Sequence, residues 1–239
     1  IILDLAHLFF KVFHKDNQSN VSRRNFLKKS FTFTGIIGSG FITASGYSNS
    51  FDPKVKNVDI NLADKHKKLK GLTAVQISDV HLGPTLKADF ANMLVERINY
   101  LKPDVIFITG DLIDGYVDSI AQEVFPLKNL KAPLGVFYVT GNHEYYWKAN
   151  EWITFVNSLG IKVLQNENEK LFFQGEEFYV CGVTDLYSKK YDQKNAPDYK
   201  KANLNIDQNK YKILLAHQPK ACFEASQFNF DLQLSGHTH

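Results

Sequence analysis

The stretch Asp104–Asp114, "DVIFITGDLID", shows the pattern that organises the chain. Its first half is a short run of β-branched and aromatic residues, which is typical of a strand buried on both faces. The run ends at Gly110-Asp111, where a conformationally permissive residue precedes a carboxylate. Ligand sites in open α/β sheets form outside the carboxyl ends of the strands, so Asp111 is a candidate site residue.

The same pattern recurs four more times along the sequence. Each time, an apolar run predicts a strand and ends in residues that can bind a ligand. We therefore expect five strand ends to meet at one place. The other four runs are "LTAVQIS" before Asp79-Val80-His81, "GVFYVT" before Gly141-Asn142-His143-Glu144, "KILLA" before His217, and "DLQLS" before Gly236-His237-Thr238-His239.

Helical periodicity fills the gaps between the first strands. Apolar residues at helical spacing predict helices over about 86–101, 117–130 and 147–159. Further short apolar runs, "KVL", "LFF" and "FYVCGV", continue the chain as strands. The expected class is α/β, with a βαβαβ start and a β-rich continuation.

The residues at these strand ends are suited to binding metal. Asp79 and His81, like His237 and His239, are two residues apart, so on an opening strand both members of a pair project to one side. Imidazole nitrogens and carboxylate or amide oxygens, without thiolates, suit Mn, Fe or Zn. The set is too large for one ion and favours two ions that share a carboxylate. Taken singly, each motif could also be a surface turn or a buried histidine.

The five blocks "DVHLG", "GDLID", "GNHE", "AHQP" and "GHTH" together resemble the calcineurin-like metallophosphoesterases, in particular an exported or membrane-attached bacterial branch. The resemblance covers about residues 70–239. It implies a β-sandwich of two mixed sheets flanked by helices. The family continues past the last block with at least one more strand, so a C-terminal strand is expected to be missing here.

The resemblance also implies roles for individual residues. One metal would be held by Asp79, His81 and His239, and the other by Asn142, His217 and His237. Asp111 would bridge the two ions. His143 would lie beside the metals and contact the phosphoryl group. In the reaction we expect it either to protonate the leaving alkoxide or to hold charge in the transition state.

The N-terminal segment differs in character from the rest of the chain. Six basic and two acidic residues give residues 1–30 a net charge of +4, which leaves −1 for the remainder of a chain whose total is +3. Arg23-Arg24, followed by "NFLKK" and an uncharged run, resembles a twin-arginine export signal. An ordinary membrane anchor with flanking positive charges is the alternative. We therefore expect an export or membrane segment over 1–50, a linker over 51–70 and a phosphoesterase domain over 71–239 that lies outside the cytoplasm.

The sequence thus predicts a hydrolase with two divalent metals, acting on a phosphodiester, phosphomonoester or pyrophosphate, with an envelope or lipid-linked substrate as one option. A nuclease and a metal-free binding or scaffold protein on the same fold are the alternatives. The slightly negative charge of the catalytic part argues against nucleic acid. The Lys- and Tyr-rich segment 185–212 is interpreted either as a pocket wall or as a solvated loop. The oligomeric state is left open.

Overall fold

The computed structural model describes residues 28–39, 52–191 and 193–238. The chain divides into two units, 1–56 and 57–239. Residues 28–39 of the first unit form a helix. Over the described ranges, no helix has both the length and the apolar character needed to cross a membrane. The predicted signal around Arg23 and Arg24 lies outside the described residues.

The second unit contains two four-stranded sheets. All neighbours in the first sheet are parallel, in the order β1-β2-β3-β4. In the second sheet, of order β5-β6-β7-β8, β5 is antiparallel to β6 and the other pairs are parallel. The strands are β1 (Ala74–Ile77), β2 (Val105–Thr109), β3 (Val136–Val139), β4 (Lys162–Val163), β5 (Glu167–Phe173), β6 (Glu176–Gly182), β7 (Tyr211–Leu215) and β8 (Leu232–Leu234).

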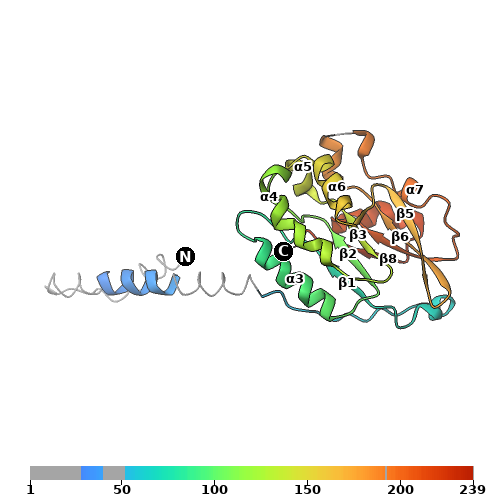
Figure 1. The fold of residues 1–239 in the computed structure, drawn as a ribbon, viewed down its shortest axis with the longest axis horizontal. Helices are drawn as coiled ribbons and strands as arrows, with labels where there is room; N and C mark the ends of the chain where they lie inside the picture. Colours follow the sequence, from blue (N-terminus) through green and yellow to red (C-terminus); the bar gives the residue numbers. More distant parts are fainter. Residues whose placement is uncertain (1–27, 40–51, 192, 239) are drawn as a thin grey trace, which may run out of the picture. The chain divides into compact units, whose positions relative to one another are not determined.

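The two sheets pack face to face, with helices on their outer faces (Figure 1). Alternation along β2 decides which layer each side chain enters: Phe107 joins the core between the sheets, whereas Ile106 and Ile108 join the core under α3, α4 and α6. On the second sheet, Phe178 and Val180 point to the inter-sheet core. The result is the mixed α/β sandwich that the sequence predicted, so the fold class is confirmed.

The helices follow the predicted pattern with a few differences. The helix expected over 117–130 ends early and continues as a 3-10 turn containing Pro126. The helix expected over about 147–159 begins slightly later, after Lys148, whose φ of 63° is left-handed. A short helix over 142–146, which the sequence did not predict, precedes it. The helices are α3 (Ala88–Tyr100), α4 (Val117–Val124), α5 (Asn142–Tyr146), α6 (Ala149–Ser158), α7 (Tyr199–Ala202) and α8 (Cys222–Ala225). The 3-10 turns are η1 (Asp64–Leu69), η2 (Phe125–Asn129), η3 (Leu186–Lys190), η4 (Gln193–Asn195), η5 (Pro219–Ala221) and η6 (Ser226–Phe228).

Candidate metal centre

The carboxyl ends of strands from both sheets bring the predicted ligands together. The loops after β1, β2 and β3 carry Asp79, His81, Asp111 and Asn142, and those after β7 and β8 carry His217 and His237. The sheets also meet directly at this edge, because the Gln76 side-chain amide donates to the Ser235 carbonyl at 2.9 Å. His239 lies outside the described residues, so its predicted role stays a prediction.

Asp111 lies at the centre of this cluster and is 1% exposed. Its Oδ2 is 3.2 Å from Nε2 of His217 and 3.9 Å from Nε2 of His143. Its Oδ1 accepts a hydrogen bond from the His143 backbone N–H at 2.9 Å. The loops approach closely here: a Cβ on Gly141 would stand 2.2 Å from Asp111 Oδ1, so only glycine fits.

Several ligand positions have unusual backbone conformations. Asp79, His81, Asp111 and His237 have φ values of 54°, 51°, 49° and 69°, all in the left-handed region. This region is sparsely populated for residues other than glycine, although Asn, Asp and His enter it more often than most. At each of these positions the backbone turns sharply just after a strand ends. The turn directs the side chain toward the cluster around Asp111.

His217 is held with one ring nitrogen turned toward the other ligands. Its Nδ1 donates to the Thr109 carbonyl at 2.7 Å, because a carbonyl oxygen can only accept. Nε2 therefore faces Asp111 and lies 3.2 Å from Oδ1 of Asn142. Burial opposes the charged ring, but the hydrogen bond and charge of Asp111 outweigh it and raise the pKa of His217 to about 9. Burial likewise opposes ionisation of Asp111, but contact with His217 lowers the pKa of that carboxyl.

Asp114 orients two histidines at once. Its Oδ1 contacts Nδ1 of His143 at 2.5 Å, and its Oδ2 contacts Nδ1 of His81 at 3.0 Å. An ionised carboxylate only accepts, so both rings carry their proton on Nδ1 and present Nε2 away from Asp114. From its place in the sequence, close to the candidate ligand Asp111, Asp114 can be either a partner that orients a histidine or a solvated loop residue. Its contacts match the first interpretation.

Glu144 connects two loops of the site through their backbone. It is fully buried and accepts three backbone N–H groups, from Asp111 at 3.1 Å, Leu112 at 2.8 Å and Gly141 at 2.5 Å. Burial, together with the charge of Asp111, raises the pKa of Glu144 against the effect of these donors. Glu144 therefore fixes the two loops that carry Asp111 and Asn142 relative to each other.

Asp79 and His237 meet on the exposed side of the cluster. Both carboxylate oxygens of Asp79 lie 3.0 Å from the His237 backbone N–H. A Cβ on Gly236 would come within 2.3 Å of Asp79 Oδ2, so the close approach of these loops also requires glycine. The ring of His237 reaches His217, with Nδ1 3.2 Å from Nε2.

The donor atoms fit divalent metal ions. Among the described residues, two groups of ligand atoms lie within 4.8 Å of one another: His81, Asp111 and His143 form one, and Asp111, His217 and His237 form the other. Asp111 is common to both groups. The first group contains His143 in place of Asp79, so His143 is a candidate ligand as well as a candidate acid. Nitrogen and oxygen donors around one shared carboxylate are what a two-metal site needs.

Sequence reasoning missed how the segment after β6 reaches the cluster. Asp185 is 2% exposed and accepts two hydrogen bonds from the Gln218 side-chain amide, both at 2.9 Å. It also accepts from the Tyr187 backbone N–H at 2.6 Å. This part of the Lys- and Tyr-rich segment is therefore anchored beside His217, and the solvated-loop interpretation is wrong for Asp185. The one available signal was the position of Asp185 three residues after the end of β6.

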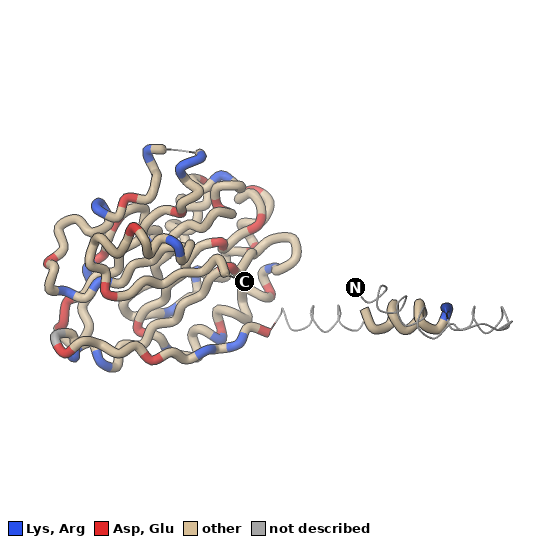
Figure 2. Tube along the Cα trace, turned by 180° about the vertical axis from the view of Figure 1, so that it is seen from behind, with Lys and Arg blue, Asp and Glu red and all other residues tan. Residues whose placement is uncertain are grey.

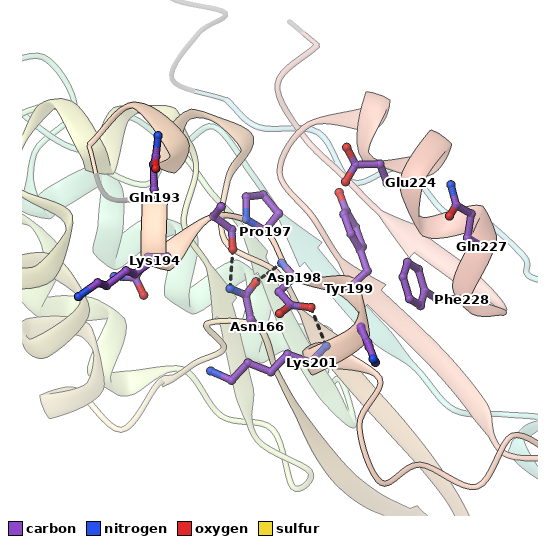
Figure 3. A pocket seen from close by; sticks show the side chains of 13 residues that line it. Asn166, Gln193, Lys194, Pro197, Asp198, Tyr199, Lys201, Glu224, Gln227 and Phe228 are labelled. Atoms are coloured by element: carbon purple, nitrogen blue, oxygen red, sulfur yellow. Dashed lines mark hydrogen bonds between the residues drawn. The ribbon is translucent and has the colours of Figure 1, made fainter.

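A separate hollow of about 520 Å³ lies away from the motif residues (Figure 3). Asn166, Tyr199 and Phe228 line it together with residues 193–198. Tyr199 stacks on Phe228 with ring centroids 6.0 Å apart. Its lining includes none of the predicted metal ligands, so it is distinct from the metal centre.

Comparison with known proteins gives a consistent family. The calcineurin-like phosphoesterase family matches residues 72–239. An uncharacterized metallophosphoesterase of Helicobacter pylori is 37% identical over 217 residues, covering 90% of this chain and 56% of that protein. A Danio rerio protein named as a transmembrane protein with metallophosphoesterase domain is 36% identical over 217 residues. The match covers 87% of this chain and 49% of that protein. The structure of the calcineurin-like phosphoesterase YfkN from Bacillus subtilis aligns with a TM-score of 0.47 at 16% identity. The alignment covers 70% of this chain and 71% of that one. The chain spans about half the length of the first two relatives.

Proposed function

The chain belongs to the calcineurin-like phosphoesterase family, and from that membership we propose that it hydrolyses phosphoester bonds with two divalent metal ions. The observation that supports this best is the position of Asp111, whose carboxylate is shared by two groups of ligand-type side chains. Asp79, His81 and His239 would hold one ion, and Asn142, His217 and His237 the other, with Asp111 between them. The ions, whether Mn, Fe or Zn, would acidify a water molecule and neutralise charge on the phosphoryl group.

The protein's own side chains would orient the site and supply a proton. Asp114 would keep the proton of His143 on Nδ1, so that Nε2 faces the reaction centre. When His143 is protonated on both nitrogens, Asp114 would stabilise the positive charge of the ring. The Nε2–H would then donate its proton to the leaving alkoxide, which leaves the ring neutral. Glu144 would fix the positions of the Asp111 and Asn142 loops relative to each other through their backbone N–H groups.

The substrate is proposed at the level of its bond: a phosphomonoester, a phosphodiester or a pyrophosphate, including lipid-linked forms from the cell envelope. A nuclease is less well supported. Figure 2 shows Lys and Arg interspersed with Asp and Glu over the described part of the second unit, without a continuous basic stripe. Binding of nucleic acid usually requires such a stripe.

The test of this proposal is Asp111→Asn in the full chain. Metal content by mass spectrometry and turnover on a panel of mono-, di- and pyrophosphate esters are measured together. We expect two metals per wild-type chain, weakened binding at both sites in the variant, and almost no turnover. Two retained metals with a near-normal rate would refute the shared role of Asp111.

We further propose that the segment 1–50 exports or anchors the chain and that the catalytic unit lies outside the cytoplasm. The Danio rerio relative is named as a transmembrane protein, which supports an association with membranes. Reporter fusions after Tyr47 test it: signal from a reporter active only in the cytoplasm would refute the proposed location. Changing Arg23 and Arg24 to Lys distinguishes the routes, because only the twin-arginine pathway should be blocked.

A further inference from the structure

Three tyrosines form a continuous surface that begins at the metal centre. We call Tyr146, Tyr187 and Tyr191 the tyrosine wall. Tyr146 lies one helical turn after Asn142, and its hydroxyl oxygen is 3.3 Å from Nδ2 of Asn142. Its ring is 5.1 Å from the ring of His143 and 5.0 Å from that of Tyr187, and Tyr187 is 5.4 Å from Tyr191.

The wall is held in place from both sides of the metal centre. Tyr146 belongs to α5, the same short helix that carries Asn142 and His143. Tyr187 lies in η3, which Asp185 caps by accepting the Tyr187 backbone N–H. Asp185 is in turn bonded to Gln218, the residue after His217. Hydrogen bonds and a shared helix therefore connect the wall to the candidate ligands.

The exposure of the wall distinguishes it from a packing core. Tyr146 and Tyr191 are 42% and 57% exposed, although large aromatic side chains contribute most when they are buried. Lys190 places its ammonium 4.2 Å from the centroid of Tyr187, which adds a positive charge to the same surface. Aromatic rings that stay open to solvent beside a candidate reaction centre, with the cation of Lys190 over the ring of Tyr187, suit a ligand that is both flat and anionic.

We propose that the tyrosine wall binds the organic group of the substrate and selects phosphoesters in which that group carries an aromatic ring. This inference rests on the proposed function, because the phosphoryl group must lie at the metal centre for its substituent to reach Tyr146 and Tyr187. The offset or edge-to-face contacts of the wall leave ring surfaces against which such a substituent can pack.

Phenylphosphonate and methylphosphonate test this without turnover, because neither contains a hydrolysable ester. Both are titrated into the full, Mn²⁺-loaded chain by calorimetry. Wild type should bind phenylphosphonate roughly two- to tenfold more tightly. Tyr187→Ala and Tyr191→Ala should bring the two dissociation constants closer together while leaving that of methylphosphonate unchanged. Tyr187→Phe should keep the preference.

Tyr100→Ala is the matched control. Tyr100 is 85% exposed at the end of α3, which leads into the amino end of β2, at the opposite edge of the sheet from the metal centre. Suppose that Tyr187→Ala and Tyr191→Ala bind methylphosphonate normally and keep the wild-type ratio of the two dissociation constants. The proposed role of the tyrosine wall would then be wrong, while the proposed function would stand. If the Mn²⁺-loaded wild-type chain binds neither phosphonate, both the role of the tyrosine wall and the proposed function would be wrong.

Discussion

Replacing Glu144 by Gln tests whether a buried carboxylate sets the geometry of the metal centre. Oε2 of Glu144 accepts from Gly141 and Asp111, and Oε1 accepts from Leu112. A glutamine is isosteric but has only one acceptor atom. In its better orientation the amide oxygen keeps the first two bonds, and the NH₂ group then faces the Leu112 N–H. One bond to a charged group is lost, and a buried donor is left unsatisfied.

These losses should lower the free energy of unfolding by about 2–4 kcal/mol, out of roughly 5–15 kcal/mol for a typical domain. Urea unfolding of the full chain in a chelator measures this change. Mn²⁺ titration should show weaker binding, because the Asp111 loop is no longer fixed. Glu151→Gln is the control: Glu151 forms an exposed pair with Lys148, so the urea midpoint should hardly move. An unchanged midpoint and Mn²⁺ affinity in Glu144→Gln would refute the reasoning.

Three further outcomes are expected. His143→Ala should retain metal and lose roughly 10²–10⁴-fold in rate on alkyl phosphoesters, but clearly less on p-nitrophenyl esters, which need no proton; loss of metal would instead make His143 a ligand. Asp114→Asn should reduce metal affinity or activity about 10–100-fold, because one oxygen cannot serve both His81 and His143; unaltered metal titration and kinetics would exclude this orienting role. A raised His217 pKa of about 9 in the metal-free chain means that protons compete with metal below that pH. Apparent Mn²⁺ affinity should therefore rise toward pH 9, by up to about tenfold per pH unit, and then level off; a flat profile would show that His217 is already neutral.

The sequence predicts this fold well because its signals are local. The run 105–109 is apolar without interruption, and β2 is buried along its whole length between two cores. The clustering of the candidate ligands Asp111 and Asn142 could also be predicted, since Gly110-Asp111 and Gly141-Asn142 each follow such a run directly. The prediction is weaker for α5: the stretch 142–146 is expected to follow a strand as a loop, but it forms a short helix that is separated from α6 by the left-handed Lys148.

The second layer of the site could not be predicted in the same way. Tyr187 reaches Tyr146 across 41 positions of sequence, and nothing local marks the pair. Glu144 stands in the polar motif "GNHE", where an exposed loop residue and a fully buried one look alike. Its role depends on backbone N–H groups of Asp111 and Leu112, which any sequence would supply.

The left-handed backbone at Asp79, His81, Asp111 and His237 has an evolutionary consequence. Such conformations cost on the order of 1 kcal/mol or more each for a residue with a side chain, and glycine would largely remove that cost. The carboxylates of Asp79 and Asp111, however, accept backbone N–H groups that glycine would leave without a partner. Selection for folding therefore opposes selection for catalysis chiefly at the other two positions. In a lineage freed from the need for the reaction, glycine should spread first at His81 and His237. The motif would then disappear from the gene long before the sandwich did.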